Sequence, residues 1–304
     1  MSSPASNNYT ARSVGSPSTP DHRVFVSFNG HIVSALHDVP LLSNSNDLVA
    51  KNTDTELTLN MVVEAPRWTN AQMKIAPDEA FAPIRQAMRK RRVAYVRNCF
   101  PHRGYIWNYG ALPQTWASGG PLHVCELGER IAQVGDVRQV RVLGVLAPRD
   151  EGILRWTLLV VDITDPLAAR LHNIDHLERE CPGMITATKE WFRLYKLPDG
   201  KEQNTIELGG EVKGRDYARE IVRTAHEAWR NVVTASTSRA VVDLQVPSFV
   251  QESNVTIRNS PGLVKRGDED LDSRLRETRQ GSSPSIAPPS SASKWWYIAA
   301  REVE

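Results

Sequence analysis

The sequence predicts an α+β protein, mainly β, organised around a small closed barrel with flanking helices. Segments rich in β-branched residues recur at even spacing through the middle of the chain, as in small barrels. A long amphipathic segment follows them, with apolar residues at helical spacing. A hydrophobic content of 40% over 304 residues is enough for a sizeable core. The expected barrel strands are Val93–Val96, Val124–Leu127, Val137–Leu146 and Trp156–Ile163.

The N-terminal part predicts an arm and then short strands. Residues 1–21 are rich in Ser, Asn and Pro, so we expect a flexible arm there. Arg23–Phe28 alternates between apolar and polar residues, which predicts a strand followed by a turn at Asn29–Gly30 and a second strand from His31. Residues 42–58 are polar and predict a surface loop, and Asn60–Glu64 predicts a further strand.

Four segments have helical patterns. Pro77 opens one that runs to about Arg89, with Phe81, Ile84 and Met88 on one face. Two shorter helices are expected in the second half of the chain, and the longest is expected after them. These three cover residues 173–180, 185–191 and 216–234, and the inner face of the longest is Tyr217, Ile221, Ala225, Trp229 and Val232.

The domain organisation follows from these patterns. Residues 22–240 predict one barrel domain. Residues 241–293 are rich in Ser, Pro and charge, which is typical of a disordered linker. The aromatic segment that begins at Lys294 predicts a strand, within residues 294–304, that returns to the domain.

Charge and cysteine content exclude several classes. A net charge of +2 gives no reason to expect a nucleic-acid partner, and the short basic run over 88–92 is interpreted as the solvated end of a helix. No apolar run approaches the roughly 20 residues of a membrane span. The three cysteines cannot all pair and lack metal-finger spacing, and no secretory signal is visible, so a cytoplasmic protein is expected.

Three long stretches resemble one known family. Residues 60–71, 96–110 and 190–201 are similar to the soluble (family I) inorganic pyrophosphatases of the eukaryotic type. The resemblance implies a five-stranded, OB-like barrel and water attack on pyrophosphate, driven by Mg²⁺ ions on carboxylates. It also implies a homodimer. The positions that resemble the family's dimer contacts are Trp68, Arg103, Trp295 and Trp296.

The sequence departs from that family where the metal ions are held. The family pattern Asp-x-Asp-Pro-x-Asp is replaced here by Ser118, Gly120 and His123, whereas Asp150 is kept. Four further positions differ in charge or polarity: Gln72 and Thr157 stand for lysines, Lys74 for a glutamate and Arg155 for an aspartate. Mutual repulsion would keep several Mg²⁺ ions from such a site. We therefore expect metal-dependent hydrolysis to be lost and no cofactor to be needed.

The remaining family positions predict a cationic pocket for an anionic small molecule. Only Ala117 separates Trp116 from Ser118, where relatives carry a longer segment, so a wider pocket mouth is expected. The expected catalytic residues are Asp150, Glu64, His123, Tyr105 and Tyr109, and the expected substrate-binding residues are Arg67, Lys74, Arg97, Arg155, Tyr195 and Lys196.

Three functions are compatible with such a pocket. The first is a repurposed, metal-independent enzyme, an isomerase, cyclase or lyase that uses acid/base chemistry on an anionic organic molecule. The second is a non-catalytic subunit for binding or assembly. The third is residual inorganic pyrophosphatase activity. Genomic neighbours or a hydrolysis assay would separate them.

Several of these residues also have purely structural interpretations. His123 could hydrogen-bond a neighbour instead of transferring protons. Asp150 could form a salt bridge with Arg155, and Lys196 could cap the segment before it. Tyr105 and Tyr109 could pack in the core. Strand alternation buries Cys125, which disfavours it as a nucleophile.

Overall fold

The computed structural model describes residues 8–42, 56–237 and 287–298. Most of the expected loop over 42–58, most of the expected linker over 241–293 and the last six residues lie outside these ranges. Among the described residues, no helix is long and apolar enough to span a membrane.

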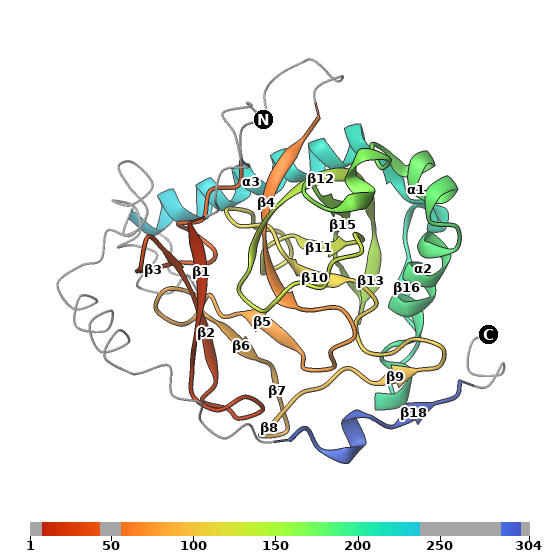
Figure 1. Ribbon diagram of the computed structural model, residues 1–304, viewed down its shortest axis with the longest axis horizontal. Helices are drawn as coiled ribbons and strands as arrows, with labels where there is room; N and C mark the ends of the chain where they lie inside the picture. Colours follow the sequence, from red (N-terminus) through yellow and green to blue (C-terminus); the bar gives the residue numbers. More distant parts are fainter. Residues whose placement is uncertain (1–7, 43–55, 238–286, 299–304) are drawn as a thin grey trace.

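The centre of the fold is a closed five-stranded barrel, as predicted (Figure 1). The expected barrel strand Val93–Val96 is wrong: only Arg92–Val93 is a strand there, and it pairs with Met88–Arg89 outside the barrel. The strands follow one another around it in the order β4, β10, β11, β15 and β12, and β12 pairs with β4 to close it. Of the barrel's strand pairs, only β11 and β15 run parallel. The bounds are β4 Thr58–Ala65, β10 Asn108–Ala111, β11 His123–Glu126, β12 Val137–Leu146 and β15 Thr157–Asp162.

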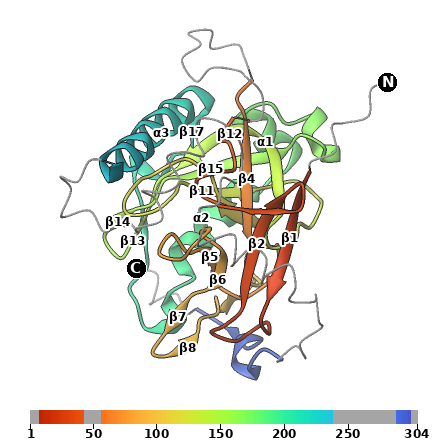
Figure 2. The same cartoon turned by 90° about the vertical axis from the view of Figure 1, so that its left-hand side faces the viewer.

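Apolar side chains fill the barrel and its two flanks. All six residues of β15 are buried, as its uninterrupted apolar run predicts. The helix α3 (Arg215–Thr237) packs against β12 and covers one side (Figure 2). Helices α1 (Ile174–Glu180) and α2 (Met184–Leu194) cover another side, where Trp107 and Trp191 belong to one cluster.

A second sheet lies beside the barrel and contains the N-terminal strands. It is formed by β1 (Tyr9–Val14), β2 (Arg23–Phe28), β3 (His31–Val33), β5 (Met73–Ile75) and β6 (Ile84–Gln86). Within the arm expected over residues 1–21, residues 9–14 therefore form a strand, because Tyr9 packs on Phe28 of β2.

Short strand pairs complete the structure. A two-stranded hairpin joins β7 to β8, and the expected returning strand β18 pairs with β9 in parallel. The bounds are β7 Met88–Arg89, β8 Arg92–Val93, β9 Asn98–Cys99, β13 Pro148–Asp150, β14 Ile153–Leu154, β16 Thr205–Ile206, β17 Lys213–Gly214 and β18 Trp295–Trp296. The 3-10 helices are η1 Pro166–Ala169, η2 Leu197–Asp199, η3 Leu208–Gly210 and η4 Ser290–Ala292.

Two helix predictions need correction. The helix expected from Pro77 to about Arg89 is wrong: Phe81 and Ala82 have positive φ angles, and β6 follows. Pro83 lies inside that span, where its ring and its missing N–H disrupt a helix. On α3 two of the five expected inner residues are buried, and in place of the other three the next residue in the chain is buried. Its members are Ala218, Val222, Ala225, Trp229 and Val233, and Tyr217 is exposed.

Candidate functional site

A cavity of about 590 Å³ collects most of the predicted site residues. Its lining comes from the end of β4, from β5, β10, β11 and β13, and from the C-terminal end of α2. The predicted residues that line it are Glu64, Lys74, Tyr105, Tyr109, His123, Asp150, Arg155 and Tyr195. Segments far apart in the sequence thus meet at one hollow.

Stacked aromatic rings form one wall of this cavity. Tyr105 lies 5.3 Å from Tyr109 between ring centroids, and Tyr195 stacks on Trp191 at 4.5 Å. Burial raises the pKa of all three tyrosines above the ordinary value, so their hydroxyls stay protonated at neutral pH and can donate hydrogen bonds. These side chains therefore both pack and face the cavity, and the two interpretations are compatible.

Asp150 forms an ion pair with Lys196. Asp150 ends β13, and the turn into β14 passes through Glu151 and Gly152, both with positive φ. The ammonium group of Lys196 contacts Oδ1 of Asp150 and lies 3.2 Å from Glu151 Oε1. Tyr195 also hydrogen-bonds Asp150. The partner of Asp150 is therefore Lys196, whereas the structural interpretation of the sequence paired it with Arg155.

His123 lies between charges of opposite sign. Its ring stacks on Tyr109 at 5.6 Å, and its Nδ1 is buried with no hydrogen-bond partner among the described residues. Burial and then the nearby Arg155 lower the pKa of His123 to about 4, against the opposing effect of Asp150. His123 is therefore a neutral imidazole at physiological pH, with one ring nitrogen left for a ligand.

Arg155 is held by the turn that carries the altered family motif. Its Nη1 donates to the carbonyl oxygen of Ser118 at 2.9 Å. Ala117 and Gly120 pair across a tight turn, in which Ser118 and Gly119 have φ angles of 51° and 83°. A Cβ added at Gly119 or Gly120 would meet nothing within 4 Å, so the cavity is open on this side.

Glu64 and Lys74 face the cavity from neighbouring strands. Glu64 is 4% exposed and accepts a hydrogen bond from the Ile75 N–H at 2.6 Å. Burial raises its pKa to about 7, although the Ile75 N–H and the charge of Lys74 oppose that shift. Lys74 itself is exposed to the cavity. Glu64 can therefore exchange a proton near neutral pH.

Three predicted site residues do not line this cavity. Lys196 lies next to it, behind Asp150. Arg97 pairs with Asp199 at 3.3 Å and faces a different cavity. Arg67 donates to the carbonyl of Gly128, beside a buried polar network.

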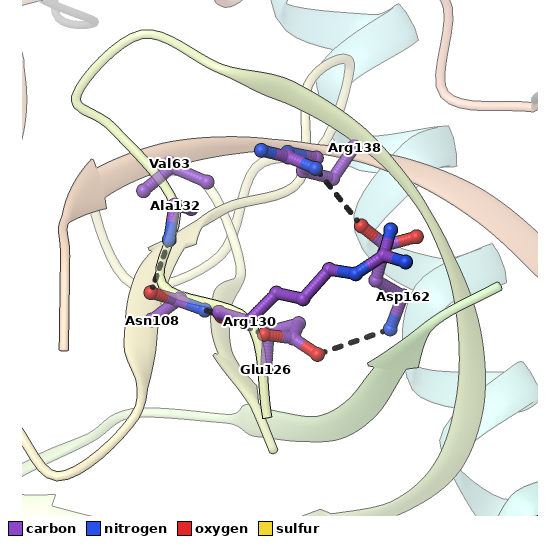
Figure 3. A pocket seen from close by; sticks show the side chains of 7 residues that line it. All are labelled: Val63, Asn108, Glu126, Arg130, Ala132, Arg138 and Asp162. Carbon is purple, nitrogen blue, oxygen red and sulfur yellow. Dashed lines mark hydrogen bonds and ion pairs between the residues drawn. The ribbon is translucent and has the colours of Figure 1, made fainter. Parts of the chain in front are cut away.

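That network surrounds a void of about 10 Å³ (Figure 3). Glu126 accepts hydrogen bonds there from Asn108 at 2.7 Å and from the Asp162 N–H at 3.1 Å. A void of this size holds about one water molecule and no substrate. Its polar groups stabilise the junction of β10, β11 and β15.

Sequence reasoning missed other residues of the main cavity. Asp78 and Arg85 line it and pair with each other at 2.8 Å. Their segment was expected to be helical, and a helix would have directed the two side chains differently. Trp191 and Phe192 also line it, and no polar signal marks them in the sequence.

Comparison with known proteins shows what kind of protein carries this cavity. The sequence profile of the inorganic pyrophosphatases matches residues 61–230. The chain belongs to the inorganic pyrophosphatase family. A protein from Neurospora crassa named "Inorganic pyrophosphatase" is 40% identical over 96% of this chain and 98% of its own length. One from Yarrowia lipolytica with the same name is 39% identical over 98% of this chain and all of its own length.

Solved structures agree with this family. The inorganic pyrophosphatase from Schistosoma japonicum has a TM-score of 0.76 and 30% identity, and the match covers 95% of this chain and 100% of that one. The type I inorganic pyrophosphatase from Toxoplasma gondii has a TM-score of 0.67 and 33% identity over 74% of this chain and 99% of that one. The barrel and its flanking helices are thus those of the pyrophosphatase fold.

These relatives contradict the function expected from the altered motif. Proteins about 40% identical over nearly the whole chain are named inorganic pyrophosphatases, which points to ordinary pyrophosphate hydrolysis. The expectations of a metal-independent isomerase, cyclase or lyase, of a non-catalytic subunit and of an inefficient pyrophosphatase are therefore wrong. So is the expectation of no cofactor, because inorganic pyrophosphatases of this family depend on Mg²⁺.

The residues of the cavity can be tested for their fit to Mg²⁺. Its carboxylates are Glu64, Asp78 and Asp150, and the last two are paired with Arg85 and Lys196. No group of three or more metal-binding side chains occurs among the described residues. Mg²⁺ often binds one or two carboxylates together with substrate phosphates and water. These residues fit an ion shared with pyrophosphate, and they do not fit a metal cluster held by the protein alone.

Proposed function

We propose that this protein hydrolyses inorganic pyrophosphate to two phosphate ions with Mg²⁺. The observation that carries the proposal is the meeting of eight predicted site residues in one cavity, in a chain whose nearly full-length relatives are named inorganic pyrophosphatases. Pyrophosphate is a compact, highly charged anion, and Lys74 of β5 and Arg155 after β14 supply positive charge to that cavity.

In this proposal the side chains bind the substrate and position the reacting groups. Lys74 and Arg155 contact phosphate oxygens, and the tyrosine hydroxyls donate hydrogen bonds to them. Asp150 holds Lys196 and would be the main protein ligand of Mg²⁺, with Glu64 beside it. Bound Mg²⁺ supplies charge neutralisation and a lowered pKa for the attacking water.

Two side chains of the cavity, Glu64 and His123, can exchange a proton or accept a hydrogen bond during the reaction. Glu64, with a pKa of about 7, can take a proton from the attacking water. His123 is neutral and has an unpartnered Nδ1, so it can hydrogen-bond the leaving phosphate without carrying charge. Water adds to one phosphorus atom, the bridging P–O bond breaks, and the proton leaves through Glu64.

Phosphate release from pyrophosphate tests this function directly. We expect turnover with millimolar Mg²⁺ and none in excess EDTA, since the cavity does not fit a metal cluster held by the protein alone. The double variant Lys74→Glu with Arg155→Glu should raise KM by about tenfold or more, because it removes two cations from the substrate. A folded protein that releases no phosphate at any Mg²⁺ concentration would contradict the proposal.

A second proposal concerns assembly. We infer that two copies associate through the aromatic surface formed by Phe100, Trp295 and Tyr297. Phe100 and Tyr297 are 57% and 75% exposed, and their rings lie 5.5 Å apart. Exposed aromatic clusters of this kind are typical of interaction surfaces. Trp68 is also exposed, in keeping with its expected role in a dimer.

Light scattering after size exclusion checks this association. We expect a mass near twice 34.0 kDa for the unmodified chain and near 34.0 kDa for Phe100→Glu. Ile153→Glu is the matched control, because it places the same charge on an exposed apolar residue of the β14 strand. A monomeric unmodified chain would refute the dimer.

We also propose a reducing, cytoplasmic location. The three thiols of Cys99, Cys125 and Cys181 are free. Burial raises the pKa of each, so none is poised as a reactive thiolate. Free thiols are typical of reducing compartments.

A further inference from the structure

A second cavity, of about 540 Å³, lies against the β7–β8 hairpin. Four parts of the chain line it: Pro20, residues 89–95 with Arg97, Asp199 after α2, and Pro289 with Ser291 near the C-terminal strand. Figures 1 and 2 both show this hairpin close to the C-terminal segment. It shares no lining residue with the cavity assigned to pyrophosphate.

The charges around this second cavity are strongly unequal. Its cationic lining residues are Arg89, Lys90, Arg91, Arg92 and Arg97, and Asp199 is its only lining carboxylate among the residues that the structure describes. Arg89 and Arg97 both pair with Asp199. The other three cations are exposed, and none has an ion pair with a described residue. The hollow therefore carries positive charge that no described residue neutralises.

The hairpin turn presents these cations at a conformational cost. Lys90 and Arg91 have φ angles of 48° and 61°. A two-residue turn of this kind favours Asn and Gly, which adopt the left-handed region most easily. Two long cations occupy those positions here. Backbone strain of this sort is often found at binding sites, where the side-chain chemistry matters more than the turn.

An uncharged hydrogen-bonding group lines the same hollow. Tyr95 contributes to the lining, and its hydroxyl is buried with no hydrogen-bond partner among the described residues. Buried hydroxyls normally have a partner. A ligand oxygen in the cavity would supply one.

The C-terminal segment limits the size of the ligand. Arg97 donates through Nη1 to the carbonyl oxygen of Ser291 at 3.2 Å, so residues 289–291 are tied to the cationic wall. A hollow with cations of residues 89–97 on one side and residues 289–291 on the other suits a compact anion better than a polymer, which needs an open strip.

We propose that this cavity binds a small polyphosphate anion, such as a triphosphate group, at a site separate from the catalytic cavity. Phosphate oxygens would contact Lys90, Arg91 and Arg92, and the Tyr95 hydroxyl would donate to one of them. The triphosphate could be free or part of a nucleotide, since both present the same oxygens.

Calorimetric titration with tripolyphosphate in EDTA tests the site on the full chain. We expect two binding events per chain for the unmodified protein. Arg91→Glu with Arg92→Glu should remove one event or weaken it by about tenfold or more. Lys74→Glu with Arg155→Glu should weaken only the second event, which is binding in the catalytic cavity. Tyr95→Phe, which removes an unpartnered hydroxyl without changing charge, should weaken the hairpin site by about threefold.

The matched control is Arg179→Glu with Arg230→Glu, which makes the same charge change on the exposed surfaces of α1 and α3. It should leave both binding events in place. A single binding event that disappears in Lys74→Glu with Arg155→Glu would overturn the proposal. So would a control variant that weakens tripolyphosphate binding as much as Arg91→Glu with Arg92→Glu does. ATP titrated in parallel distinguishes a nucleotide from free polyphosphate, and tighter binding of single-stranded RNA than of either would overturn the small-anion assignment.

Discussion

Asp150→Asn should lower kcat/KM for pyrophosphate by about 100-fold or more, which is the usual cost of removing a charged group that stabilises a transition state. The reason lies in the charges of the cavity. Asp78 is paired with Arg85, and burial keeps Glu64 partly protonated near neutral pH. Asp150 is also ion-paired, with Lys196, and in the proposed mechanism it is both the main protein ligand of a substrate-borne Mg²⁺ ion and the group that positions Lys196.

Steady-state phosphate release over a range of Mg²⁺ concentrations measures this effect. The control is Glu151→Gln, which changes the next carboxylate in the chain. Glu151 is exposed and also contacts Lys196, at 3.2 Å, but it does not line the cavity. We expect kcat/KM of this control to fall by less than about threefold, because exposed ion pairs contribute little. Equal losses in the two variants would show that Asp150 acts only through the salt bridge.

The barrel was predictable because its strands are marked by local patterns. Val137–Leu146 was bounded correctly, and the apolar run Leu158–Val161 within β15 is typical of a buried strand. The segment after Pro77 was not predictable from spacing alone. Phe81, Ile84 and Met88 fit a helical face, but Pro83 and the positive φ of Phe81 direct the chain into β6 instead.

The candidate site was predictable in part. The resemblance to a family identified Glu64, Tyr109 and Asp150, and the structure brings them to one cavity. Arg67 and Arg97 lie elsewhere, because the direction of a side chain depends on packing that the sequence does not display. The basic run over 88–92 was interpreted as the end of a helix, whereas it forms a hairpin that lines a second cavity.

The function expected from the altered motif failed for a different reason. Counting lost carboxylates at Ser118, Gly120 and His123 treated every Mg²⁺ ligand as belonging to the protein. Pyrophosphate itself carries several anionic oxygens and water completes the coordination of Mg²⁺, so protein carboxylates are only part of the ligand set. A count of protein carboxylates is therefore weaker evidence about function than similarity to relatives that match the chain over nearly its whole length.

Glu64 makes the stability of the protein depend on pH. Its pKa is about 7 in the folded protein, against 4.5 for an ordinary glutamate. Between these values the folded state binds more protons than the unfolded state, so the free energy of unfolding falls as the pH rises through that window. The shift corresponds to about 3 kcal/mol, all of which is lost above a pH of about 7.

Glu64→Gln should remove this dependence, because the amide stays neutral at every pH and its oxygen can still accept from the Ile75 N–H. Denaturant unfolding at about pH 5 and about pH 8 should therefore show the variant gaining about 2 to 3 kcal/mol relative to the unmodified protein between the lower and the higher pH. Glu227→Gln, on the exposed face of α3, is the control and should follow the unmodified protein at both values. Parallel behaviour of Glu64→Gln and the unmodified protein would mean that the buried carboxyl ionises as an ordinary one does, and Glu64 could then not serve as the proton acceptor near neutral pH.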